Sequence, residues 1–204
     1  MSPAETYEIF MARPESAQIA SRFACEGLAR WLRWRTPNNV LEWGAGIGTL
    51  TQVICDYASR AAVFSVEPKP DLLDLCRANV RPSGMAPFFC CGVGRHGTAY
   101  EFVVVDGDDT PYEPLARRAV VFVEGGRRGQ RTDRVMYWQI QGRSFCCAQW
   151  KPRDRSKGYH VYLFEPTAPE RAWFAAVRVR EWAMDLLVRL GGGTVGKRRE
   201  RRYY

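Results

Sequence analysis

Residues 40–51 read Val-Leu-Glu-Trp-Gly-Ala-Gly-Ile-Gly-Thr-Leu-Thr, a short apolar strand followed by a glycine-rich turn and the beginning of a helix. Gly44, Gly46 and Gly48 permit a tight turn and let backbone N–H groups approach a ligand closely. The start of the helix adds a partial positive charge at the same point. The segment therefore predicts a ligand-binding turn at a strand end, with a simple packing turn as the alternative.

Two features distinguish this turn from a dinucleotide-binding fingerprint. The pattern G-x-G-x-x-G requires a third glycine, but Thr49 stands at that position and the spacing is G-x-G-x-G. Glu42, two residues before the first glycine, would repel a pyrophosphate but favour a cationic ligand. A nucleotide-binding fold without further chemistry stays open on these residues alone.

Strands and helices alternate on both sides of the turn. Apolar runs predict strands at 40–43, 62–66, 86–91, 100–107 and 119–125, and helical spacing predicts helices at 15–34, 48–59 and 71–79. Two of the strands are apolar without alternation, which is typical of parallel strands buried on both faces. This order of elements predicts an α/β sheet.

The last third of the chain departs from this alternation. Residues 144–150 and 159–165 predict two strands joined by a short polar loop, which favours an antiparallel hairpin. Thr167 and Glu170 form a capping-box pattern that opens a long helix, and Gly191 ends it after Leu190.

Composition limits the class of protein. The chain has 204 residues, 46% of them hydrophobic and 25% charged, which suits one globular domain. No apolar run approaches the ~20 residues of a membrane span, and the first ten residues lack the basic start of a signal peptide. Seven cysteines are too few for a disulfide scaffold and odd in number. We therefore expect a cytoplasmic protein without a membrane partner.

The net charge of +8 lies beyond residue 124, mainly in segments 125–134, 151–157 and 197–202. A basic surface attracts anionic partners without identifying them. Residues 191–204 are expected to form a flexible, solvated basic tail; binding to nucleic acid or to anionic lipid is the alternative for that segment.

Glu42, Gly44, Gly46 and Gly48 match every fixed position of the pattern (Asp/Glu)-x-Gly-x-Gly-x-Gly. The segment thus resembles motif I of the class I S-adenosylmethionine-dependent methyltransferases. The second marker of that family is an acid at the end of strand two that contacts the ribose hydroxyls. Glu67 stands there, nineteen residues after Gly48. A carboxylate suits this role because it accepts two hydrogen bonds from a vicinal diol.

The resemblance covers about residues 38–165 by order of elements. It implies a single α/β, Rossmann-like methyltransferase domain over residues 1–190, with a seven-stranded, mostly parallel sheet, an antiparallel final strand and helices on both faces. It also implies S-adenosyl-L-methionine as cofactor, and methylation of an oxygen or nitrogen atom of a small molecule.

The resemblance further implies the residues of the site. The expected cofactor-binding residues are Glu42, Gly44, Ala45, Gly46, Gly48, Glu67, Pro68, Val93 and Asp106. Val93 would cover one face of the adenine. Asp106 follows strand four, where the family often has an acid facing the active site, and it is the expected catalytic proton acceptor. His96 is the second catalytic candidate.

A metal-dependent mechanism is the alternative for the same acids. Catechol-type methyltransferases place metal-binding acids at the ends of strands four and five, where Asp106 and Glu124 stand. Oxygen ligands of this kind suit Mg²⁺. Gly125 and Gly126 replace the Asp-Asn pair of that type, so no metal is expected.

Other expectations rest on weaker patterns. Residues 1–37 are expected to be a helical segment, whose first part would form a lid over the substrate through Tyr7, Phe10, Met11 and Arg13. Trp173, Val177, Met184 and Val188 on the last helix predict core packing or a homodimer seam. Two other functions stay open, an RNA methyltransferase that uses the basic C-terminal half and a non-catalytic cofactor-binding protein.

Overall fold

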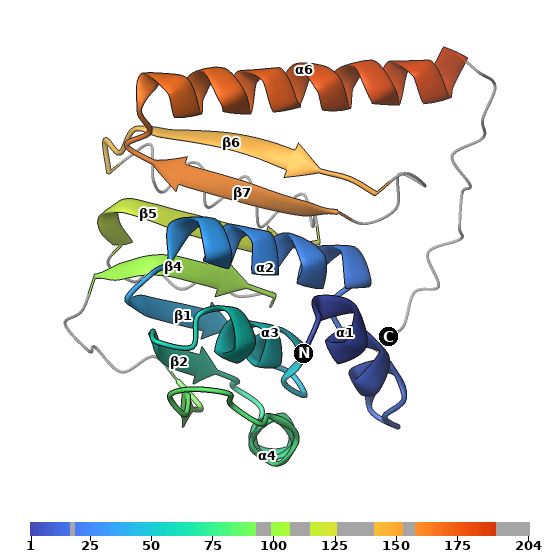
Figure 1. Cartoon of the computed structure of the whole chain (residues 1–204), viewed down its shortest axis with the longest axis vertical. Coiled ribbons are helices and arrows are strands. Elements are labelled where there is room, and N and C mark those ends of the chain that lie inside the picture. Colours follow the sequence, from blue (N-terminus) through green and yellow to red (C-terminus); the bar gives the residue numbers. More distant parts are fainter. Residues whose placement is uncertain (17–18, 93–98, 107–114, 126–140, 153–157, 191–204) are drawn as a thin grey trace.

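The computed structural model describes residues 1–16, 19–92, 99–106, 115–125, 141–152 and 158–190. A seven-stranded sheet in the order β3-β2-β1-β4-β5-β7-β6 forms its centre (Figure 1). The strands are β1 (Asn39–Trp43), β2 (Ala62–Val66), β3 (Phe88–Cys90), β4 (Tyr100–Val105), β5 (Leu115–Glu124), β6 (Phe145–Trp150) and β7 (Tyr159–Phe164). The expected seven-stranded α/β sheet is confirmed.

The strands at the centre of the sheet are parallel and carry apolar side chains on both faces. β1 pairs with β2 and β4, and β4 pairs with β5, all in parallel. Val40 and Val104 are buried against the helices, whereas Leu41 and Val103 are buried in a second cluster on the other face. Successive side chains of a strand point to opposite faces, so the runs without alternation follow from burial on both sides.

β7 lies between β5 and β6 and runs antiparallel to both. The predicted hairpin is therefore correct, and β6 points in the same direction as the parallel strands. Because β7 alone is reversed, the carboxyl ends of β1, β4 and β5 meet at one edge of the sheet. Ligands of open α/β sheets bind at this edge.

The described helices are α1 (Pro3–Met11), α2 (Arg22–Arg35), α3 (Thr49–Tyr57), α4 (Pro70–Asn79) and α6 (Ala168–Leu190). Figure 1 shows α2 in front of the sheet and α6 along β6. Residues of α2, α3 and α6 share one core cluster with the strands, so these three helices cover the same face. The segments between β4 and β5 and between β5 and β6 fall largely outside the described residues. None of the helices described is both long and apolar enough to cross a membrane.

The helix expected at 15–34 is wrong at its beginning. α2 begins at Arg22, because the Ser21 hydroxyl accepts a hydrogen bond from the Ala24 N–H at 3.2 Å and caps the helix there. A separate helix, α1, precedes it, and opens with a capping box between Ser2 and Glu5. The apolar spacing from Ile19 onward did not reveal this boundary.

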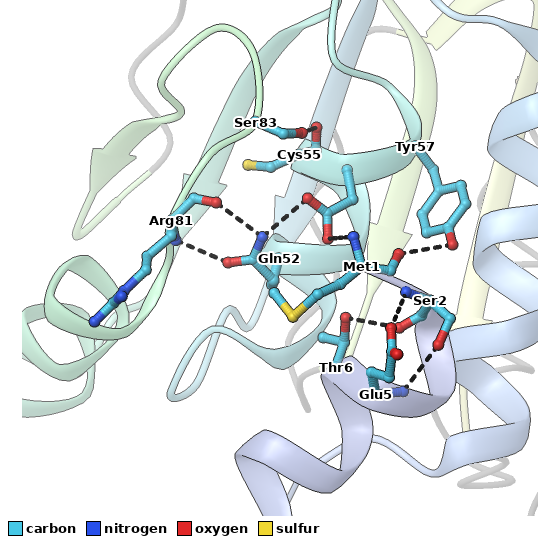
Figure 2. A network of polar contacts seen from close by, with 10 residues as sticks. Met1, Ser2, Glu5, Thr6, Gln52, Cys55, Tyr57, Arg81 and Ser83 are labelled. Atoms are coloured by element: carbon cyan, nitrogen blue, oxygen red, sulfur yellow. Dashed lines mark hydrogen bonds and ion pairs between the residues drawn. The ribbon is translucent and has the colours of Figure 1, made fainter.

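Polar contacts attach the beginning of α1 to the end of α3 (Figure 2). The Tyr57 hydroxyl donates a hydrogen bond to the Met1 carbonyl at 2.9 Å, and the Met1 amino group lies 3.7 Å from Asp56 Oδ2. Gln52 in turn donates to the Arg81 carbonyl at 3.0 Å and accepts from the Arg81 N–H at 2.8 Å. α3 therefore connects α1 to the segment that follows α4.

Candidate functional site

The turn after β1 has the conformation that its glycines allow. Gly44, Gly46 and Gly48 have φ angles of 85°, 54° and 101°, which side-chain-bearing residues rarely adopt. The N–H groups of Gly44 and Ala45 both donate to the Val66 carbonyl, at 2.9 and 3.1 Å. These bonds hold the beginning of the turn against the end of β2.

The three glycines have different surroundings. A Cβ on Gly48 would lie 2.6 Å from Val80 Cγ2 and 3.1 Å from Cys76 Sγ, so Gly48 is needed for close packing against α4 and the residue after it. A Cβ on Gly46 would meet no atom within 4 Å. The turn is thus packed on one side and open at Gly46, where a ligand can approach the backbone.

Glu67 lies at the open side of this turn. It follows β2 directly and is 5% exposed. Its Oε2 accepts a hydrogen bond from the Gly46 N–H at 2.8 Å, and its Oε1 accepts from the Lys69 N–H at 3.0 Å. The Glu67 N–H donates to the Cys90 carbonyl at 3.0 Å, which fixes the residue between β1 and β3. The structure therefore brings together Gly46 and Glu67, two residues that the sequence analysis assigned to one site.

Glu42 is fully buried beneath the turn. Its Oε2 accepts hydrogen bonds from the Thr51 hydroxyl at 2.7 Å and the Ser65 hydroxyl at 2.6 Å, whereas its Oε1 is buried without a hydrogen-bond partner. Burial raises the pKa of Glu42 to about 7, although the two hydroxyls act in the opposite direction. Glu42 thus joins β1, α3 and β2, and retains one unsatisfied carboxylate oxygen.

Asp106 and Glu124 lie at the same edge, on the face covered by α2. The register pairs Val104 with Phe122, so Asp106 and Glu124, each two residues further on, point to the same face of neighbouring strands. The Asp106 N–H donates to the Trp43 carbonyl at 2.9 Å and keeps the end of β4 beside β1. The row of strand ends therefore places Asp106 next to the glycine turn.

The beginning of α2 approaches these two carboxylates. The Ser21 N–H lies 3.4 Å from Glu124 Oε1. Burial raises the pKa of the Cys25 thiol to about 12, and the charges of Asp106 and Glu124 act in the same direction. Ser21 and Cys25 were not expected at the site. The serine that caps α2 was the available signal for this helix start, since Ser is a preferred N-cap residue.

Thr51, Ser65 and Asn79 hold Glu42 and the glycine turn in place from the side of the protein interior. The Asn79 amide donates to the Ile47 carbonyl at 3.0 Å and fixes the turn between two of its glycines. These residues were also missed, because a single hydroxyl or amide gives no pattern in one sequence. Their role follows only from the pairing of β1 with β2 and the position of α4.

The remaining predicted residues divide into two groups. Pro68 is exposed next to Glu67, in a position to border a ligand. Val93 and His96 lie outside the described residues, as do the arginines at 127–134 and the tail 191–204. Across the described ranges, no three His, Cys, Asp or Glu side chains form a group that could hold a metal ion.

Comparisons with known proteins identify the fold. No family model matches this sequence, and no curated protein matches it. Solved structures do match. One is an O-methyltransferase from Bacillus cereus in complex with SAH, with a TM-score of 0.59 and 15% identity over 80% of this chain and 90% of that one. Another is the SAH-bound methyltransferase PaMTH1 from Podospora anserina, with a TM-score of 0.60 and 12% identity over 81% of this chain and 88% of that one.

A third match is the O-methyltransferase TomG from Streptomyces achromogenes, which is involved in tomaymycin synthesis and was solved with SAM. Its TM-score is 0.56, with 17% identity over 80% of this chain and 88% of that one. The chain therefore has the Rossmann-like fold of class I methyltransferases, as the glycine turn and the strand order predicted.

Proposed function

We propose that this protein transfers a methyl group from S-adenosyl-L-methionine to an oxygen atom of a small molecule. The observation that carries the proposal is the contact between the Gly46 N–H and Glu67 at the open side of the turn, 2.8 Å apart. This contact brings Glu67, which we propose binds the ribose, together with the open backbone at Gly46 at the carboxyl edge of the sheet. The similar structures include O-methyltransferases in complex with SAM or SAH, which favours oxygen over nitrogen as the acceptor atom.

The residues present fit this cofactor. The space at Gly46 leaves room for a ligand against the backbone, and Glu67 offers a carboxylate to a vicinal diol. Glu42 places a partly ionised carboxyl group beneath the turn, which favours a cationic ligand over a pyrophosphate. Pro68 would border the ribose. Val93 remains our proposed contact for the adenine.

When bound, the cofactor supplies an electrophilic methyl group on a sulfonium ion. The chain must align an acceptor with that group and exclude water. An acceptor hydroxyl loses its proton as the new bond forms, and we propose Asp106 as the group that takes it. His96 is the second candidate for this role. Ser21 and Cys25, at the beginning of α2, border the same place.

A small-molecule acceptor fits the charges at this edge. Asp106 and Glu124 place two carboxylates side by side there, and carboxylates repel the phosphate backbone of a nucleic acid. One basic segment, residues 125–134, follows Glu124 directly, and apart from Gly125 and the residues near 151 the basic segments lie outside the described ranges. We therefore favour a small acceptor over RNA.

We further propose that the end of α1 closes the substrate side. In Figure 1, α1 lies on the side to which the arrowheads of β2 and β4 point. Phe10 is buried, and the Arg13 guanidinium lies 5.3 Å from the centre of its ring. Arg13 Nε is buried without a hydrogen-bond partner, which leaves a donor for an anionic group of a ligand. Tyr7 and Met11 complete the segment.

Calorimetry tests the first step. We expect binding of S-adenosylhomocysteine and of S-adenosylmethionine, and no binding of NAD. Tight binding of NAD without a response to either sulfur compound would overturn the proposal. A screen of hydroxylated aromatic compounds that measures S-adenosylhomocysteine release then tests the transfer itself; binding without turnover on any acceptor would favour a non-catalytic protein.

A further inference from the structure

The solvent side of α6 carries a continuous apolar row. Ala172, Ala176, Val179, Ala183 and Leu186 follow one another at intervals of four and three residues, the spacing of a helix–helix seam. Val179 is 65% exposed, although its side chain is apolar. The row lies opposite the side of α6 that packs on the sheet, where Phe174 and Val177 are buried. Of the residues that the sequence assigned to core or seam, Val177 is therefore core.

Apolar side chains also flank this row. Trp182 and Leu187 are 67% and 62% exposed. Arg180 is a charged residue among the flanking positions of this stretch, and it forms an ion pair with Glu181 at 2.8 Å. The solvent side of α6 thus carries mainly apolar side chains, with Arg178 and Arg180 exposed beside them.

An aromatic groove borders the same helix. It has a volume of about 470 Å³ and lies between α2 and α6, over β6 and β7. It is lined by Arg30, Trp31, Trp34, Trp150, Tyr159, Pro169, Glu170 and Trp173. Trp173 belongs both to the wall of the groove and to the exposed side of α6, where it is 48% exposed. The row and the groove therefore form one apolar surface, which we call the α6 surface.

We infer that the α6 surface binds a second copy of this chain, with the two α6 helices antiparallel. A two-fold axis on the solvent side of α6, at the level of Glu181 along the helix, would place Val179 opposite Ala183 of the second copy. The same axis places Ala176 opposite Leu186. Each layer then combines a larger side chain with alanine, which lets the helices approach closely and interdigitate.

The same symmetry fills the groove. The same axis brings Leu187 of the second copy to the level of Ala175, two residues along the helix from Trp173, so that each exposed leucine lies beside the aromatic wall of the other chain. A two-fold interface requires a self-complementary surface, and a projecting leucine and a receiving groove at opposite ends of one helix meet this requirement.

The area is sufficient for a dimer. The exposed parts of Trp173, Val179, Trp182, Leu186 and Leu187 amount to roughly 550 Å² for one chain, taking about 150–250 Å² for a fully exposed large side chain. Two chains together would bury at most about 1,100 Å², close to the ~1,000 Å² expected of a specific interface. A lipid surface would also accept an apolar helix face, but the alternation with alanine favours a helix as the partner.

Sedimentation equilibrium of the full chain tests this interface. We expect a concentration-dependent mass that reaches twice that of the chain, and at least a tenfold weaker dimer for Val179→Glu. Phe88→Glu is the matched control, because Phe88 is 57% exposed on β3, at the opposite edge of the sheet. This control should dimerise as the parent does. A monomeric parent protein would overturn the inference, as would equal dimerisation of parent and Val179→Glu.

Cross-linking tests the antiparallel arrangement. Trp182→Cys places a thiol close to the axis, so we expect a disulfide between two chains on mild oxidation, located by mass spectrometry. Phe88→Cys, at the opposite edge of the sheet, should give none; equal cross-linking of both variants contradicts the arrangement. Vesicles containing phosphatidylserine test the lipid alternative: binding of a monomeric parent chain that Val179→Glu abolishes would replace the dimer by a membrane surface. The inference does not depend on the proposed function.

Discussion

The backbone N–H of Gly46 and the carboxylate of Glu67 are joined by a 2.8 Å hydrogen bond across 21 residues of sequence. The bond connects the turn after β1 with the end of β2. It also occupies one of the two Glu67 oxygens that a ribose would use. Ligand binding at this place should therefore exchange a contact within the protein for a contact with the ligand.

Glu67→Ala should weaken binding of S-adenosylhomocysteine by about 1.5–3 kcal/mol, the range for hydrogen bonds to a charged group. Calorimetry measures this change. Asp74→Ala is the control, because Asp74 is an acid on α4 whose side chain is 75% exposed. This variant should bind S-adenosylhomocysteine as tightly as the parent protein. Unchanged affinity in Glu67→Ala would remove Glu67 from the site.

Two glycine substitutions should separate packing from binding. Gly48→Ala should lower the free energy of unfolding by about 3 kcal/mol, because the positive φ is strained and the new Cβ meets Val80. Gly46→Ala should cost only about 1 kcal/mol in stability, yet should impair cofactor binding, since its Cβ enters the open space. Urea unfolding and calorimetry measure the two effects. If both variants lost the same amount of stability and the same amount of cofactor affinity, the two glycines would not have the separate roles in packing and binding.

The buried Glu42 should give the stability a pH dependence. Its pKa is raised from 4.5 to about 7, so between these values the folded state binds more protons than the unfolded state. The free energy of unfolding should then fall as the pH rises through this range, by about 3 kcal/mol at most, and level off above pH 7. Glu42→Gln should remove this decline, and urea unfolding across the range checks it.

Ser65→Ala provides a second measurement on the same carboxylate. The Ser65 hydroxyl lowers the pKa of Glu42 by donating a hydrogen bond to it. Without that bond the pKa should rise further, and the decline in stability should extend to higher pH. A parent and a Glu42→Gln variant with the same pH profile would show that Glu42 does not titrate in this range.

Asp106→Asn should retain cofactor binding but reduce turnover about 10²-fold or more, the usual scale for a positioned acid or base. Asparagine has the same shape as aspartate but cannot take the proton of the acceptor. The assay measures S-adenosylhomocysteine release with an acceptor found by screening. Full activity of the variant would exclude Asp106 from the chemistry.

A chelator should leave the activity intact, since glycines at 125 and 126 replace the Asp-Asn pair of the metal-dependent type. The assay is the same, with and without EDTA. Loss of activity that Mg²⁺ restores would make Asp106 and Glu124 metal ligands, and would replace the proton-acceptor mechanism.

The sequence predicted those parts of the fold that depend on local pattern. The buried strands and the glycine turn are visible from hydrophobic runs and from Gly44, Gly46 and Gly48. The beginning of α2 was missed, because Ser21 caps the helix inside a segment that keeps helical spacing. The hydrogen bonds from Thr51 and Ser65 to Glu42 could not be predicted either, because they depend on which strand and helix lie beside β1.

The residues of the candidate site were also only partly predictable from the sequence. Glu67 could be placed beside the turn from its position after a strand, and the structure puts it there. The surroundings of Asp106 could not be foreseen, because Ser21 and Cys25 come from a helix some 80 residues earlier. Nothing in a single sequence indicates which helix covers the end of which strand.

The placement of β7 between β5 and β6 affects how the sheet folds while the chain is being synthesised. β6 leaves the ribosome before β7, the strand with which it pairs. Until about residue 164 has emerged, β5 and β6 both present unpaired edges, which can pair with other chains. Chains that end before β7 should therefore aggregate, whereas those that lose only residues beyond α6 should remain folded.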